Sequence, residues 1–93
     1  MAQSPHVEIR YCTGCRWGLR AAWLAHELLS TFENELVTVS LIPDSTGGVF
    51  EIQLDGALVW SRADVERFPE PTVIKRAVLD IVAPGRALGH IDI

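Results

Sequence analysis

The spacing of apolar residues changes its period at the first cysteine, and this change constrains the fold more than any other feature. Residues 7–11 carry an apolar side chain at every second position, which predicts a strand with one buried face. From about residue 16 to residue 32, apolar side chains recur every three or four positions, which predicts an amphipathic helix. A strand that leads directly into a helix is typical of the start of a βαβ unit. The apolar face of the helix consists of Ala21, Leu24, Ala25, Leu28 and Phe32.

Three more strands and a second helix follow. Alternating apolar residues predict strands over 36–41, 50–54 and 57–60, and the first two are separated by a loop over 43–48. Asp55-Gly56 between the last two strands predicts a tight hairpin. Residues 61–71 are interpreted as a connecting segment, and the tail to residue 93 has no clear pattern. The second helix follows Pro71 and ends at Pro84-Gly85, with Ile74, Ala77, Val78 and Ile81 on its apolar face.

This order of elements predicts an α/β protein of the two-layer α+β kind, β-α-β-β-β-α, with a four-stranded mixed sheet. The strand over 6–11 and the strand over 36–41 should be parallel and joined by a right-handed crossover, whereas the last two strands form an antiparallel hairpin. All four strands alternate, so one face of the sheet should be covered and the other open. Both helices are therefore expected on one face. A length of 93 residues predicts a single domain over residues 1–93.

Composition and charge exclude several classes of function. The formal charge is −4 and the sequence has no basic stripe, which argues against nucleic acid as a partner. No apolar stretch approaches the roughly 18 residues of a membrane span. The first residues lack the pattern of a secretory signal, so we expect a cytoplasmic protein whose thiols are kept reduced. The open sheet predicts a monomer or a weak homodimer.

The only two cysteines, Cys12 and Cys15, are three positions apart at the junction of the first strand and the first helix. A helix N-terminus lowers the pKa of a nearby thiol, and Arg16 and Arg20 add positive charge. We therefore predict a catalytic thiol–disulfide pair, in which Cys12 is the exposed attacking thiolate and Cys15, inside the first helical turn, resolves the mixed disulfide. The small residues between them, Thr13 and Gly14, leave access open and are candidates for substrate docking.

Other interpretations remain open. The cysteines could be structural apolar residues, or the chain could be a non-catalytic binding module or an oxidation sensor whose cysteines are not turned over. Zinc prefers four ligands, and the three histidines His6, His26 and His90 are scattered, so no metal site is predicted within one chain. Zinc-dependent assembly, with a site shared by two copies of the chain, remains a third interpretation. Trp17 either shields the disulfide and forms part of a docking surface, or packs at the edge of the core. Trp23 and Trp60 are expected to be packing residues.

An ordered set of short motifs resembles the selenoprotein W/T/H-like (Rdx) family, in particular its bacterial members that carry cysteine. The set comprises residues 7–11 leading into Cys12-Thr13-Gly14-Cys15, then residues 31–36, 48–52, 55–56, 58–61 and 68–70, and the similarity covers about residues 6–83. The resemblance implies a thioredoxin-like fold and redox exchange with protein thiols or glutathione, without a bound cofactor.

The resemblance also bears on the roles of individual residues. In the selenoprotein members, selenocysteine occupies the position of Cys15, which implies that Cys15 meets the substrate and Cys12 resolves. This order is the reverse of the one that we infer from the helix terminus. Thioredoxin-like enzymes usually place a cis-proline before the third strand, but here Thr46-Gly47-Gly48 occupies that place. Gly47 and Gly48 are therefore further candidates for docking, because glycine lets a partner's backbone approach closely.

Overall fold

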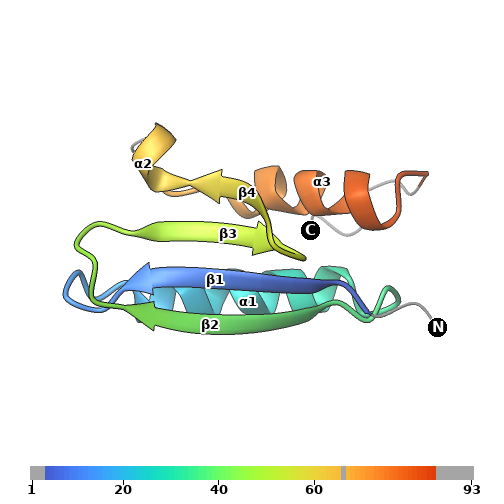
Figure 1. The fold of residues 1–93 in the computed structure, drawn as a ribbon. Helices are drawn as coiled ribbons and strands as arrows, with labels where there is room; N and C mark the ends of the chain where they lie inside the picture. Colours follow the sequence, from blue (N-terminus) through green and yellow to red (C-terminus); the bar gives the residue numbers. More distant parts are fainter. Residues whose placement is uncertain (1–3, 66, 86–93) are drawn as a thin grey trace.

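The chain folds into a mixed sheet with helices on one side. The computed structural model describes residues 4–65 and 67–85, so the tail beyond residue 85 lies outside the described residues. Figure 1 shows the order of the elements along the chain. They are β1 (His6–Cys12), α1 (Gly18–Thr31), β2 (Thr38–Asp44), β3 (Phe50–Leu54), β4 (Ala57–Ser61), α2 (Arg62–Val65) and α3 (Pro71–Val82).

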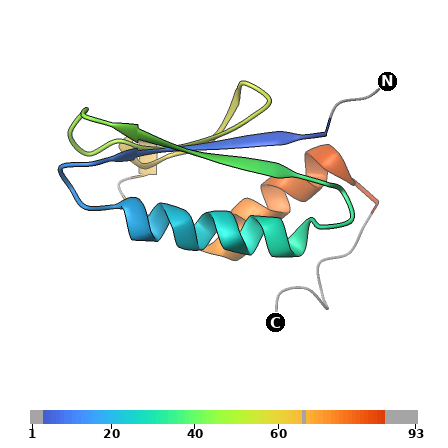
Figure 2. The ribbon, with the colours of Figure 1, turned by 90° about the horizontal axis from the view of Figure 1, so that it is seen from below.

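The four strands lie in the order β2-β1-β3-β4. Strand β1 is parallel to β2 and antiparallel to β3, and β3 and β4 form an antiparallel hairpin with a register shift at Ile52/Gln53. The hairpin turn places both Asp55 (φ 50°) and Gly56 (φ 86°) in the left-handed region, as the preferred two-residue turns require. Helices α1 and α3 cover the same face of the sheet (Figure 2). The predicted two-layer mixed fold is thus confirmed.

The core lies between the sheet and the two long helices. The apolar face predicted for α1 is confirmed, since all of its members are buried. From the sheet side, β1 contributes Val7 and Ile9, and β3 contributes alternate residues, as a strand with one covered face requires. The buried side chains of the sheet and of α1 are Val7, Ile9, Phe50, Ile52, Leu54, Ala21, Leu24, Ala25, Leu28 and Phe32.

The face that α3 turns to the core differs in part from the prediction. Ile74 and Val78 are buried as expected, but Ile81 is exposed, and Lys75 and Leu79 are buried instead. The ammonium group of Lys75 lies 2.8 Å from the carboxylate of Glu27 on α1. Because Glu27 supplies this partner, a charged side chain can be buried where the sequence pattern predicted a polar surface.

The second strand starts and ends later than predicted. Leu36 adopts a left-handed conformation (φ 57°) and is exposed, so the chain still turns at that point, and β2 begins at Thr38. Pro43 and Asp44, which we expected in a loop, belong to β2 and pair with Tyr11 and Cys12. Proline is tolerated there because β2 is an edge strand.

Two further predictions for the outer parts of the fold were wrong. Residues 61–71 are not only a connection, because they include the short helix α2. Trp23 does not pack, since 51% of it is exposed, whereas Trp60 does pack against the core.

Within residues 4–65 and 67–85, no helix is long and apolar enough to cross a membrane.

Candidate redox site

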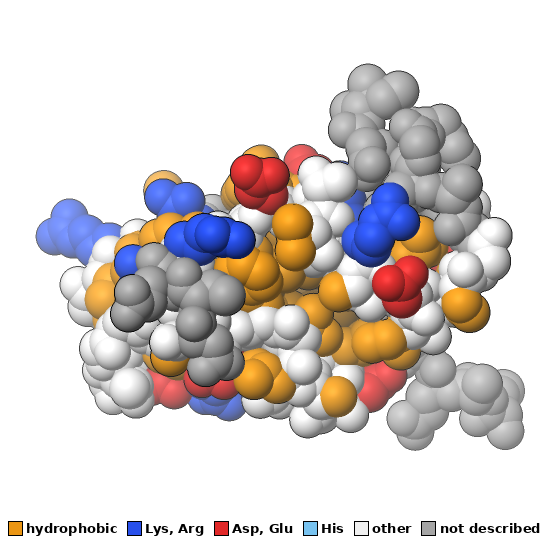
Figure 3. All heavy atoms as spheres, turned by 90° about the horizontal axis from the view of Figure 1, so that it is seen from above, with side chains coloured by type: hydrophobic (Ala, Val, Ile, Leu, Met, Phe, Trp, Pro, Cys, Tyr) orange, Lys and Arg blue, Asp and Glu red, His pale blue; other side chains and the backbone are white. Residues whose placement is uncertain are grey.

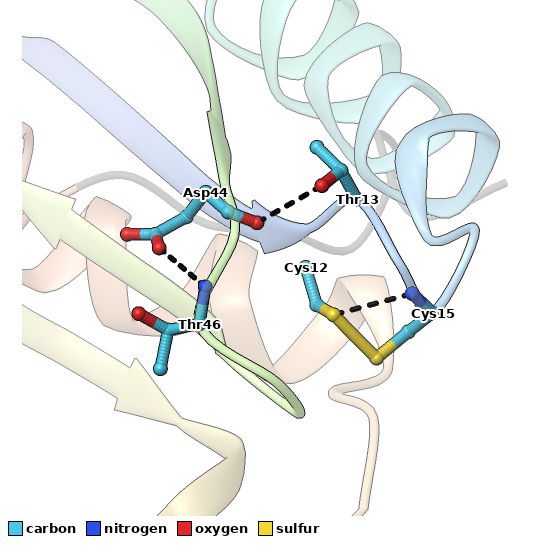
Figure 4. The surroundings of a disulfide bond; sticks show 5 residues. All are labelled: Cys12, Thr13, Cys15, Asp44 and Thr46. Atoms are coloured by element: carbon cyan, nitrogen blue, oxygen red, sulfur yellow. Dashed lines mark hydrogen bonds between the residues drawn. A yellow bond between two sulfur atoms is a disulfide. The ribbon is translucent and has the colours of Figure 1, made fainter.

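Cys12 and Cys15 form a disulfide at one end of the sheet. Cys12 is the last residue of β1, and the turn that follows places the Cα atoms of Cys12 and Cys15 5.3 Å apart. The backbone N–H of Cys15 donates to the sulfur of Cys12 at 3.2 Å. Figure 4 shows this turn beside the loop that follows β2. The predicted pairing of the two sulfur atoms is therefore present.

Backbone hydrogen bonds hold the cysteine turn against the β2–β3 loop. The N–H of Cys12 donates to the carbonyl of Val49 at 2.8 Å, and the N–H of Thr13 donates to the carbonyl of Asp44 at 2.9 Å. The hydroxyl of Thr13 reaches the same Asp44 carbonyl at 3.3 Å (Figure 4). Inside the turn, Arg16 donates its N–H to the carbonyl of Thr13 at 3.1 Å. Hydrogen bonds therefore fix the backbone of the cysteine turn to the end of β2 and to the β2–β3 loop.

The relative exposure of the two cysteines contradicts the prediction that Cys12 is the accessible one. Cys12 is only 1% exposed, whereas Cys15 is partly exposed. The physical reason is that Cys12 still belongs to β1 and is paired with both β2 and the β2–β3 loop, while Cys15 lies in the turn. A molecule that approaches from solvent therefore meets Cys15 first.

Helix α1 also begins later than predicted. Arg16 takes a left-handed conformation (φ 60°), and the helix starts at Gly18. Cys15 therefore precedes the helix and is not inside its first turn.

Trp17 belongs to a cluster of three aromatic rings next to the cysteine turn. Its ring meets Phe68 edge-on, with centroids 4.8 Å apart, and Phe50 in the same manner at 6.3 Å. Phe50 and Phe68 are themselves 5.2 Å apart. Trp17 is thus partly buried against the core, and the packing role is observed. The sequence did not predict the packing of Phe68 against Trp17, because Phe68 lies in a segment without hydrophobic periodicity.

The other docking candidates lie on both sides of the disulfide. Thr13 and Gly14 are exposed in the cysteine turn. Gly47 is exposed and Gly48 partly exposed in the β2–β3 loop, next to the residue whose carbonyl binds Cys12. Gly48 has φ +79°, a conformation that glycine adopts without strain. Thr13 and Gly14 thus lie between the two cysteines, and Gly47 and Gly48 lie in the loop that is hydrogen-bonded to Cys12.

With this geometry in view, the comparisons with known proteins identify the family. The family model described as "Rdx family" matches residues 6–80. The chain belongs to the Rdx family. A search of curated proteins found no match.

Two solved structures resemble this Rdx protein over most of its length. A protein from Bordetella parapertussis is 49% identical, with 84% of this chain and 98% of that chain covered and a TM-score of 0.79. A selenoprotein W-related protein from Vibrio cholerae is 46% identical, with 86% of this chain and 99% of that chain covered and a TM-score of 0.81. The thioredoxin-like fold expected from the sequence is therefore confirmed for this Rdx protein.

The charge of Asp44 stabilises the loop that faces the disulfide. The backbone N–H of Thr46 donates to its carboxylate at 2.7 Å, and Arg10 donates to the same carboxylate at 3.2 Å. These hydrogen bonds, that from Thr46 first, hold the pKa of the Asp44 carboxyl below its ordinary value of 3.8. At neutral pH, Asp44 is therefore ionised and ties the end of β2 to the loop.

The described part of this Rdx protein contains no cluster of three or more histidine, cysteine or acidic side chains that could hold a metal ion. His6 contacts the hydroxyl of Ser40 at 2.7 Å, and His26 lies on the exposed side of α1. His90 lies outside the described residues.

Proposed function

We propose that this Rdx protein is a thiol–disulfide redox protein that cycles Cys12 and Cys15 between dithiol and disulfide. The observation that carries the proposal is the disulfide itself, with one sulfur buried at a strand end and the other in a partly exposed turn. Its partners are protein thiols or glutathione, and its place is a reducing compartment such as the cytoplasm. The disulfide closes a short loop and so adds little to the stability of the fold, which favours thiol–disulfide exchange as its role in such a compartment.

The difference in exposure favours Cys15 as the attacking group. In the dithiol form, the Cys15 thiolate attacks one sulfur of a partner disulfide, and the other partner sulfur leaves as a thiolate that takes up a proton. Cys12 then loses its proton and attacks the Cys15 sulfur, which breaks the mixed disulfide and releases the second partner thiol. The partner gains two electrons and this protein loses two. Two molecules of glutathione, or one protein dithiol, restore the dithiol form.

Trapping experiments with single cysteine variants test both the function and the order of attack. We expect Cys12→Ser to accumulate a mixed disulfide with glutathione through Cys15, because no second thiol remains to resolve it. Cys15→Ser should accumulate it much more slowly, because its remaining thiol is buried. The wild-type protein is titrated in glutathione buffers of graded potential, with thiol labelling and mass spectrometry as readouts, and the double serine variant is the blank.

Two results would contradict the proposal at different levels. If the wild-type protein forms no internal disulfide at any accessible glutathione potential, the redox function is wrong. If Cys15→Ser traps the mixed disulfide faster than Cys12→Ser, the function stands but the order of attack is reversed.

A further inference from the structure

Three arginines for which the described residues show no ion pair lie at the redox end of the molecule. Arg16 lies in the cysteine turn, Arg20 in the first turn of α1 and Arg62 at the start of α2. The ion pairs found among the described residues use other cations, Arg10 and Lys75. Figure 3 shows Lys and Arg side chains collected at the end of the molecule where α2 lies. In a chain with a net charge of −4, these three arginines thus form a local group of cations close to the cysteine turn.

Two of these arginines are held in place by the aromatic cluster. The guanidinium of Arg20 lies 4.0 Å from the ring centroid of Phe68, and that of Arg62 lies 5.0 Å from Trp17 and 5.1 Å from Phe68. Stacking on a ring fixes the plane of a guanidinium and loses no N–H donor, so its edge can still bind a carboxylate. The Nε of Arg62 is buried and has no hydrogen-bond acceptor among the described residues.

Backbone contacts place this cluster beside the disulfide. The N–H of Trp17 donates to the carbonyl of Cys12 at 3.5 Å. On its other side, Cys12 donates to Val49, the residue before Phe50, and the Phe50 ring packs against Trp17. The aromatic cluster that carries the two stacked arginines is therefore joined directly to the cysteine turn.

Apolar exposure on α1 indicates that the natural occupant is a protein. Leu19 is 88% exposed and Trp23 is 51% exposed, and they lie one helical turn apart on the side of α1 opposite its buried face. Exposed tryptophan with arginine is the composition that protein interfaces favour. A small anion would use the arginines alone and leave both apolar side chains in water.

We propose that Arg16, Arg20, Arg62, Leu19 and Trp23 form a docking surface for an acidic segment of a partner protein, which brings the partner's disulfide to Cys15. The charge of the segment and the charge of the surface are complementary, and the apolar side chains of α1 add contact area next to them. This inference rests on the proposed redox function, since it names the class of substrate that the same pair acts on.

The test measures how fast the dithiol form of the full chain reduces three synthetic peptide disulfides. The peptides share one sequence with a leucine near the cysteine and differ only in flanking residues, which are glutamate, serine or lysine. Each rate constant is divided by that of dithiothreitol with the same peptide, which removes the effect of the flanks on the peptide's own reactivity. At low salt we expect the glutamate peptide to react about tenfold faster than the lysine peptide. The ratio should approach one at about 1 M salt, where charges are screened within a few ångströms.

Variants separate charge from packing. Arg16→Gln removes a charge from a side chain with no described contact, and we expect it to lower the glutamate-peptide rate about threefold at low salt. Arg76→Gln, which changes another exposed arginine that lies on α3 outside the docking surface, should leave all three rates unchanged. Leu19→Ser should lower the rates of all three leucine-bearing peptides about twofold to threefold at every salt concentration, because it removes apolar contact.

Three results would overturn the docking surface. One is equal normalised rates for the glutamate and lysine peptides at low salt. Another is a loss for Arg76→Gln as large as that for Arg16→Gln. A third is a loss for Arg16→Gln with none for Leu19→Ser, which would mean that the arginines recognise a small anion and not a protein. Failure of the redox function itself would look different, because the wild-type chain would then reduce none of the three peptides.

Discussion

Removal of Glu27 should destabilise this protein much more than removal of Lys75, although the two side chains form one ion pair. The pair joins α1 to α3 at 2.8 Å, with the Lys75 side chain 6% exposed and that of Glu27 37% exposed. At this distance and an effective dielectric constant of about 20, the attraction is about 6 kcal/mol. Taking the ammonium out of water costs several kcal/mol, so the net contribution of the intact pair is close to zero.

The two single variants differ in what they leave behind. Glu27→Ala leaves a buried ammonium without its carboxylate, and we expect it to lower the free energy of unfolding by about 3 kcal/mol. Lys75→Met replaces the cation with an apolar chain of similar length, and the remaining carboxylate of Glu27 is accessible to water. We therefore expect Lys75→Met to lie within about 1 kcal/mol of the wild-type protein.

Urea unfolding followed by tryptophan fluorescence measures both values, with the cysteines kept oxidised so that all variants share one redox state. Glu33→Ala, which removes an exposed carboxylate just after α1, is the matched control and should change stability by less than about 0.5 kcal/mol. If Lys75→Met loses as much stability as Glu27→Ala, the pair is a net favourable contact, and the argument from desolvation is wrong.

Two further predictions concern the loop that faces the disulfide. Gly48→Ala should cost about 1 kcal/mol in the same urea assay, because φ at that position is +79°, whereas Gly47→Ala should be nearly neutral; equal losses would contradict this account. In an NMR titration, the Asp44 carboxyl should titrate below 3.8, because Thr46 and Arg10 stabilise its charged form. Since the folded pKa is lowered, the stabilisation by Asp44 is present above the unfolded pKa and is lost as the pH falls through the folded pKa. A measured pKa above 3.8 would refute the assignment.

The parts of the fold that the sequence predicted well are those in which hydrophobic period and burial agree. The buried face of α1 was predicted correctly because its apolar residues recur at helical spacing and face the sheet, although the polar Thr31 is buried beside them. The hairpin at Asp55-Gly56 was predicted because its turn needs residues that tolerate positive φ. The face of α3 was predicted only in part, because the burial of Lys75 depends on a carboxylate 48 positions earlier in the chain.

The candidate site shows the same division between local and long-range causes. The pairing of Cys12 with Cys15 follows from local spacing and was predicted. The burial of Cys12 depends on its bonds to β2 and to Val49, which no local pattern reveals. The left-handed conformation of Arg16 delays the helix, and nothing in its side chain signals this. Phe68 reaches the site from a segment that precedes α3, so its contacts with Trp17 became visible only in the folded chain.

Pro43 has a consequence for how copies of this chain can meet. It lies in an outer strand of the sheet and has no backbone N–H to offer to a neighbour. The opposite edge, β4, is irregular where it pairs with β3. Each edge is therefore interrupted at one point, which makes it a less regular template for an added strand. The edges of the sheet in this small domain therefore disfavour the edge-to-edge strand pairing from which fibrils grow.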